Sequence, residues 1–128
     1  YIHFTYSDSD ITAVFDRDQL GRVVTNLVKN AMQATENTPM PCIEVSLYKD
    51  NDSITLKVKD NGIGISETDR DKIFEPRFTT KTSGSGLGLA MVKNIILSYG
   101  GTISFTSEVG KGSEFTAVLA HFLKTNQT

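Results

Sequence analysis

The chain has 128 residues, about the length of one domain, and its apolar, charged and glycine content is that of an ordinary globular protein. Lysine and arginine total 13 against 15 acidic residues, which excludes a broad basic surface for nucleic acid or an anionic membrane. Cys42 is the single cysteine, so an internal disulfide is excluded and a reducing compartment is indicated. The apolar runs are far shorter than the roughly 18 residues of a membrane-spanning helix, and the amino terminus lacks a signal-peptide pattern.

Two short strands and one long helix are predicted in the first third of the chain. Residues 2–6 and 12–15 are rich in β-branched and aromatic side chains, which is typical of strands. Over residues 20–35 the apolar residues change to helical spacing, which predicts an amphipathic helix. Asp16, followed three residues later by Gln19, predicts a capping box at its start.

The middle of the chain predicts a hairpin followed by a less regular stretch. Apolar and polar residues alternate over 43–47 and 54–58, the pattern of two strands with one buried face. Residues 66–74 start with a capping signal and predict a short helix. Residues 75–86 have no period of their own and collect threonine, serine and glycine, which predicts a mobile lid.

The last third predicts a helix and a terminal hairpin. The helix covers residues 87–99 and is stopped by two glycines. Strands over 103–107 and 115–119 flank the turn sequence Gly-Lys-Gly at 110–112. With no internal repeats, the pattern indicates a single domain over residues 1–128.

Asn26 and Asn30 lie four residues apart and therefore project from one side of the first long helix. Polar residues on the wet face of an amphipathic helix are routine, which is one interpretation of this pair. Asparagine is nevertheless a poor helix former, and its side-chain oxygen is a ligand that magnesium accepts. The pair alone leaves both interpretations open.

Asp60 follows a predicted strand and precedes Gly62 and Gly64. Asp-Asn-Gly is a common turn sequence, so a tight turn is one interpretation. In the other, the carboxylate faces a pocket that the glycines leave open and accepts a hydrogen bond from an exocyclic amine. Such a carboxylate selects adenine, because guanine would leave polar groups unpaired.

The glycine-rich sequence at 84–89 opens the last predicted helix, so free backbone amides and the positive end of the helix dipole favour a phosphate there. It is not a dinucleotide fingerprint, because the third glycine comes one place early and no strand precedes it. The sequence Gly-Lys-Gly-Ser at 110–113 is not a Walker loop, because glycine replaces the hydroxyl residue after lysine.

In this order and spacing the elements resemble the nucleotide-binding boxes of the histidine kinase branch of the Bergerat-fold ATPases. Residues 26–31 resemble the N box, 60–65 the G1 box, 74–81 the F box and 84–89 the G2 box. The resemblance covers almost the whole chain. It implies a Bergerat ATP-binding fold, a two-layer α/β (α+β) sandwich whose mixed, mostly antiparallel sheet of about five strands is covered on one face by three helices.

The resemblance implies that the domain binds ATP and Mg²⁺. Asn30 would coordinate the magnesium, Asn26 would assist at the phosphates, and Lys81 would complete the catalytic set. Asp60 would meet the adenine amine. The other residues implied to contact the nucleotide are Gly62, Gly64, Ile65, Phe74, Arg77, Thr80, Gly84, Ser85, Gly86, Leu87, Gly88, Leu89 and, through water, Thr116.

Gln33 and Ala34 depart from the commonest N box, which has lysine and tyrosine at these two places. The departure weakens the expectation that this helix supplies a cation to the phosphates. Together with Phe-Glu-Pro followed by Thr-Thr-Lys, it resembles the nitrogen-regulation type of sensor kinase. Lys81 is therefore the expected cation, joined by Arg77 when the lid closes.

Asn26 also bears on the reaction class. The gyrase, Hsp90 and mismatch-repair ATPases and the anti-sigma serine kinases carry a glutamate at that place, which acts as a general base. An amide cannot accept a proton at neutral pH, so Asn26 disfavours self-contained hydrolysis and transfer to serine. A hydrolase and a catalytically silent nucleotide-binding module are kept as the alternatives to a kinase.

Neither His3 nor His121 is predicted on a helix beside a carboxylate, where the family carries its phosphoacceptor. We therefore expect the chain to donate the γ-phosphoryl group of ATP to a histidine on a companion dimerisation and phosphoacceptor domain. A response regulator receiver domain is the expected indirect partner, and nucleic acid is not expected. The full protein is expected to be a homodimeric, membrane-attached kinase of which this part is cytoplasmic.

Overall fold

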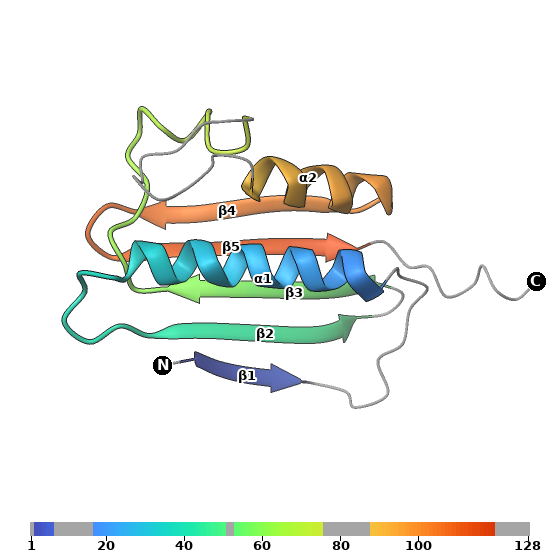
Figure 1. The fold of residues 1–128 in the computed structure, drawn as a ribbon, viewed down its shortest axis with the longest axis horizontal. Coiled ribbons are helices and arrows are strands. Elements are labelled where there is room, and N and C mark those ends of the chain that lie inside the picture. The colour runs from blue at the N-terminus through green and yellow to red at the C-terminus, as the bar shows by residue number, and fades with distance from the viewer. Residues whose placement is uncertain (1, 7–16, 51–52, 76–87, 120–128) are drawn as a thin grey trace, which may run out of the picture.

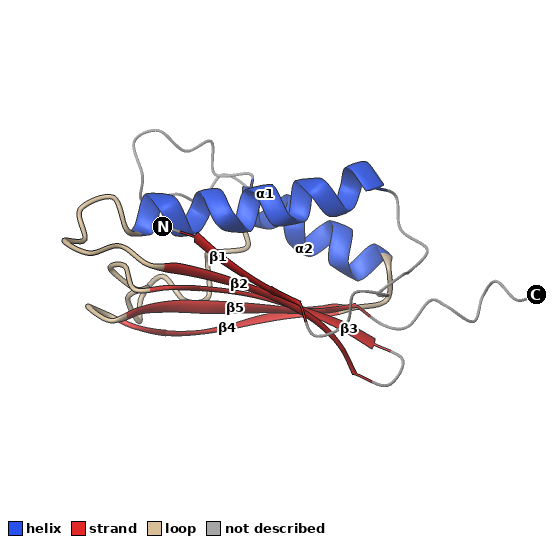
Figure 2. Ribbon diagram, turned by 90° about the horizontal axis from the view of Figure 1, so that it is seen from below, coloured by secondary structure: helices blue, strands red, loops and turns tan. Residues whose placement is uncertain are grey.

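The computed structural model describes residues 2–6, 17–50, 53–75 and 88–119. These residues form a two-layer α/β sandwich in which two helices cover one face of a five-stranded sheet (Figures 1 and 2). No helix in the described ranges is both long and apolar enough to cross a membrane. In chain order the elements are β1 (Ile2–Tyr6), α1 (Arg17–Ala34), β2 (Ile43–Asp50), β3 (Ser53–Asp60), α2 (Gly88–Ser98), β4 (Thr102–Glu108) and β5 (Gly112–Leu119).

The strands lie in the order β1-β2-β3-β5-β4, so the terminal hairpin inserts its second strand against β3. β1 runs parallel to β2, and the other neighbouring strands are antiparallel. The turn between β4 and β5 has positive φ angles of 84° at Gly110 and 122° at Gly112, which favour glycine. The mixed, mostly antiparallel five-stranded sheet is thus confirmed.

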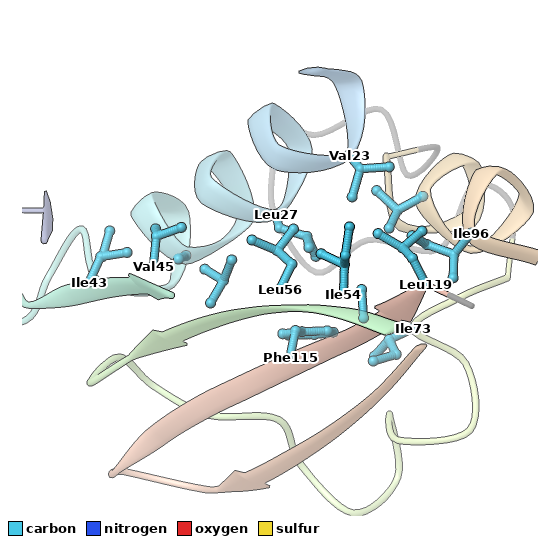
Figure 3. Close-up of a cluster of buried hydrophobic side chains, with 14 residues drawn as sticks. Val23, Leu27, Ile43, Val45, Ile54, Leu56, Ile73, Ile96, Phe115 and Leu119 are labelled. Carbon is cyan, nitrogen blue, oxygen red and sulfur yellow. The ribbon is translucent and has the colours of Figure 1, made fainter. Parts of the chain in front are cut away.

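The core lies between the helices and the inner face of the sheet. Figure 3 shows Leu27 of α1 beside Leu56 of β3, and Ile96 of α2 beside Leu119 of β5, with Val23 of α1 directed toward the same layer. Strand alternation places every second residue of β3 and β5 on this face, and Phe115 is 2% exposed. Each fully buried aliphatic side chain contributes about 1.5–3 kcal/mol to folding, so this interface orders the helices that flank the site.

The predicted helix over 66–74 is wrong, and the described helices number two instead of three. The segment instead forms linked turns, in which the amides of Asp69, Lys72 and Glu75 each donate to the carbonyl three residues earlier, at 3.0, 2.9 and 2.9 Å. The physical reason is that only Ile73 and Phe74 are large and apolar here, so no helical stripe exists to bury. The predicted strand over 12–15, the Asp16 cap and residues 76–86 of the predicted lid lie outside the described residues.

Candidate functional site

Asp60 is the last residue of β3, and its side chain is buried, with 4% of the residue exposed. It follows Leu56 and Val58 on the inner face of the sheet, beneath the helices. One carboxylate oxygen accepts a hydrogen bond of 2.8 Å from the amide of Gly62. A buried carboxylate needs such donors, because removal from water disfavours its charge.

The loop after Asp60 is clamped between α1 and the β4–β5 turn, and this distinguishes it from a simple surface turn. Its Ile63 amide donates to the Ala34 carbonyl at 3.1 Å, and its Ile63 carbonyl accepts from the Gly110 amide at 2.9 Å. A Cβ at Gly62 would overlap the Ala34 carbonyl, so only glycine fits there. Gly64 has a φ of 78° and lies against the backbone of Glu108.

Asn61 has a structural role that the sequence did not indicate. Its side-chain Nδ2 donates to the carbonyl of Met40 and its Oδ1 accepts from the amide of Cys42, both at 2.8 Å. These bonds tie the loop to the segment before β2. Asn61 thus supports the loop through the chain ahead of β2, while its neighbour Asp60 faces the helices.

Asn26 lies beside the first residue of α2. Its Nδ2 donates to the carbonyl of Arg22 at 2.8 Å, and its Oδ1 lies 2.9 Å from the position that a Cβ on Gly88 would occupy. Gly88 therefore gives the Asn26 amide room at the positive end of the α2 dipole. Asn30 follows one turn later on the same side of α1 and is half-buried. The structure thus places Asn26 at the start of α2, with Asn30 one turn further along α1.

Phe74 belongs to an aromatic cluster on the inner face of the sheet. Its ring centroid lies 6.1 Å from that of Phe105 and 6.3 Å from that of Phe115, both in edge-on geometry. Lys93 of α2 places its Nζ 5.4 Å from the Phe74 ring centroid. These contacts fix the residues that precede position 76, and Leu89 packs against the same core.

Ile65 continues the loop after Asp60, and its amide donates to the Ser107 hydroxyl at 2.8 Å. Thr116, which is predicted to reach the adenine through water, lies away from Asp60 in the sheet register. It pairs with Lys57 on β3 and lies on the outer face of the sheet, whereas Ser113 pairs with Asp60 itself. Ser113 is 7% exposed and shares the inner face with Asp60. β5 begins three residues earlier than predicted, and that early start brings Ser113 into the strand.

Seven predicted contact residues lie outside the described part of the chain. They are Arg77, Thr80, Lys81, Gly84, Ser85, Gly86 and Leu87. Their assignments stay predictions. Within the described ranges, no group of three or more His, Cys, Asp and Glu side chains is placed to hold a metal ion.

A pocket of about 320 Å³ lies where β3, β4 and β5 meet the β4–β5 turn. Its lining includes Lys59 and Lys111 together with Glu108 and Glu114. Lys111 Nζ lies 3.7 Å from Glu108 Oε2, and both side chains are exposed. Because lysine and glutamate are balanced here, the pocket has no excess positive charge for a triphosphate.

Residues 15–122 match the model of the family described as histidine kinase-, DNA gyrase B- and HSP90-like ATPases. The chain belongs to this family. Sensor histidine kinase ZraS of Escherichia coli K12 is 42% identical over 115 residues, 90% of this chain and 24% of that protein. AtoS of the same strain is 40% identical over 113 residues, 88% of this chain and 18% of that protein.

Solved structures agree with this membership. The catalytic domain of histidine kinase ThkA has a TM-score of 0.82 at 32% identity, covering 94% of this chain and 78% of that chain. Full-length ShkA in complex with AMPPNP has a TM-score of 0.79 at 28% identity, covering 94% of this chain and 26% of that chain. The molecule is therefore a histidine kinase ATPase domain, and it spans about a quarter or less of the sensor kinases it matches.

Proposed function

We propose that this histidine kinase ATPase domain binds Mg-ATP between α1, the loop after β3 and the start of α2. It then donates the γ-phosphoryl group to a histidine on a companion dimerisation and phosphoacceptor domain. The observation that carries the proposal is the close approach of the Asn26 side chain to Gly88. This contact puts an amide at the N-terminus of α2, the end of a helix that favours phosphates.

Asp60 is the proposed adenine selector, because its buried carboxylate faces the helix layer and can accept a hydrogen bond from the adenine amine. Ser113, its neighbour on β5, replaces Thr116 as the proposed second group at the base. Gly62 and Gly64 let the loop after Asp60 lie against the carbonyl of Ala34 and the backbone of Glu108, since neither carries a Cβ. The adenine end of the nucleotide is therefore assigned to the end of β3.

The triphosphate is assigned to the start of α2, with Lys81 as the proposed cation. Asn30, half-buried beside Asn26, offers the amide oxygen that Mg²⁺ accepts together with phosphate oxygens and water. This donor set fits magnesium, which in kinase sites takes few protein ligands. When bound, the ion neutralises charge on the phosphates.

Transfer then needs positioning more than proton chemistry. The acceptor imidazole is already a nucleophile, so its nitrogen forms a bond to the γ-phosphorus while the bond to the bridging oxygen of ADP breaks. Asn26 cannot remove a proton from water, which distinguishes this site from one that hydrolyses ATP alone. The work of the domain is to orient ATP and stabilise developing charge.

A hydrolase and a silent nucleotide-binding module are the competing functions. The silent module would bind ATP equally well, and only transfer to an acceptor separates it from a kinase.

The proposed kinase function also includes a response regulator receiver domain as the indirect partner, a homodimeric full-length kinase and membrane attachment. The cytoplasm is the proposed location, since ATP and the acceptor must be present together.

Nucleotide binding is tested by calorimetric titration of the chain with ATP and with GTP, each with and without Mg²⁺. We expect ATP to bind, GTP to bind at least about tenfold more weakly because one polar group is mismatched, and Mg²⁺ to strengthen ATP binding. Equal affinity for ATP and GTP would contradict the role of Asp60. An affinity for ATP that Mg²⁺ leaves unchanged would contradict the role of Asn30.

A further inference from the structure

Three inner-face side chains form a row across the end of the sheet. Ser107 of β4 pairs with Ser113 of β5, and Ser113 pairs with Asp60 of β3. Directly paired residues of neighbouring antiparallel strands have their Cβ atoms about 4.5–5.5 Å apart. The Ser113 hydroxyl therefore lies between Asp60 and Ser107.

The Ser107 hydroxyl takes part in three hydrogen bonds. It accepts from the Ile65 amide at 2.8 Å, donates to the Gly112 carbonyl at 3.1 Å and shares a bond of 2.8 Å with the Ser113 hydroxyl. A hydroxyl has one hydrogen to donate and two lone pairs to accept with. All three bonds form together only when Ser113 is the donor to Ser107.

We propose that Ser107 is a positioning residue that sets the polarity of the base pocket by holding the Ser113 proton. Ser113 then presents only acceptor lone pairs, beside the acceptor carboxylate of Asp60. An amine of the base meets two acceptors, whereas a carbonyl oxygen in its place meets no donor. The pocket selects a 6-amino purine through this pair in addition to Asp60, so the inference rests on the proposed nucleotide function.

Ser107 is itself held from two sides. Arg70 donates a hydrogen bond from Nη2 to the Ser107 carbonyl, and its guanidinium lies 5.8 Å from the ring centroid of Phe105. The Ile65 amide ties the hydroxyl to the loop that follows Asp60. The orientation of the hydroxyl is thus fixed by the same elements that form the pocket.

The test compares the affinity of the chain for ATP with its affinity for inosine triphosphate, which carries a carbonyl oxygen where ATP carries the amine. In Ser107→Ala, the Ser113 proton is released and can turn to donate to that carbonyl. We expect the dissociation constant for inosine triphosphate, divided by that for ATP, to fall about tenfold. A change of this size is the effect of one hydrogen bond near 1.4 kcal/mol. Ser107→Thr keeps the hydroxyl and should retain the ratio.

Ser104→Ala is the matched control, because Ser104 lies on the same strand with an exposed side chain on the outer face. It should leave the ratio unchanged. Ser113→Ala removes the acceptor itself and should lower the ratio in a chain whose Ser107 is intact. Adding Ser107→Ala to that variant should then change the ratio no further, because the two serines act as one unit.

A Ser107→Ala chain that loses ATP and inosine triphosphate affinity by the same factor would overturn the inference and leave the proposed function standing. So would an unchanged ratio in Ser113→Ala. If the unaltered chain bound neither nucleotide, both the inference and the proposed function would be overturned.

Discussion

Asp60 brings a carboxylate to the edge of the apolar core, and the loop that follows it folds back so that a backbone amide donates to this carboxylate. The Gly62 amide donates to it at 2.8 Å, and this bond exists because Gly62 can lie against the Ala34 carbonyl. A larger residue at position 62 would push the amide away. At the scale of single residues, the site therefore depends as much on the absence of a side chain at Gly62 as on the carboxylate of Asp60.

Asp60→Asn tests the adenine contact. The remaining side-chain oxygen can still accept from Gly62, but the amide nitrogen then faces the adenine amine with a donor. A hydrogen bond to a charged group is worth about 1.5–3 kcal/mol, so we expect ATP affinity to fall by roughly 10- to 150-fold in calorimetry. Asp71→Asn, at an exposed position of the linked turns, is the control and should bind ATP normally.

Gly62→Ala and Gly21→Ala form a pair that tests the clamped loop. At Gly62 the new methyl group meets the Ala34 backbone, so we expect urea denaturation to show a loss of about 1–3 kcal/mol, the typical cost of overpacking. At Gly21, on the exposed side of α1, nothing lies within 4 Å of the new Cβ. There alanine should raise stability by about 0.5–1 kcal/mol. Equal effects at the two positions would refute the clamp.

The residues at the site were predictable to different degrees. Asp60, Asn26 and Gly88 stand in motifs whose order is visible in the sequence. The structure places Asn26 beside Gly88, and Asp60 at the buried end of β3. Ser113 was missed because its importance comes from pairing with Asp60, and the pairing of two strands more than 50 residues apart leaves no local pattern. Thr116, by contrast, is implied only by the resemblance to the histidine kinase family, through water.

At the scale of elements, the contact between α1 and α2 decides how the site is assembled. The two helices pack side by side over the sheet, with the start of α2 beside the middle of α1 (Figure 1). The amphipathic period of α1 was sufficient to predict that helix, and two glycines marked the end of α2. Residues 66–74 were mispredicted, because a capping signal at Ser66 is followed by turns that the sheet stabilises through Ile73 and Phe74.

Gly88→Ala tests this contact. The new Cβ would lie 2.9 Å from Asn26 Oδ1, so the flexible amide must turn away from the start of α2. We expect the affinity for Mg-ATP to fall about tenfold, the loss of one hydrogen bond near 1.4 kcal/mol, while the melting temperature changes little because alanine favours the helix. Gly21→Ala on the same helix as Asn26 is the control for nucleotide binding. Unaltered Mg-ATP affinity in Gly88→Ala would show that Asn26 is not at the phosphates.

At the scale of the whole molecule, the proposed function requires that the histidine that accepts phosphate lie outside this ATP-binding domain. His3 lies in β1 and not on a helix, and His121 lies outside the described residues. The family and the fold class followed from the sequence because the boxes and their spacing cover most of the chain. Nothing in local periodicity could show that β5 lies between β3 and β4, since sheet order is set by packing over long distances.

The measurement that tests the central claim is phosphoryl transfer from γ-labelled ATP. The chain is incubated with Mg²⁺ and the separate dimerisation and phosphoacceptor domain of its own kinase, and labelled protein and free phosphate are followed together. The account predicts acid-labile phosphohistidine on the acceptor domain and no label on this chain. Stable histidine label on this chain, or steady release of inorganic phosphate with an unlabelled acceptor domain, would contradict it.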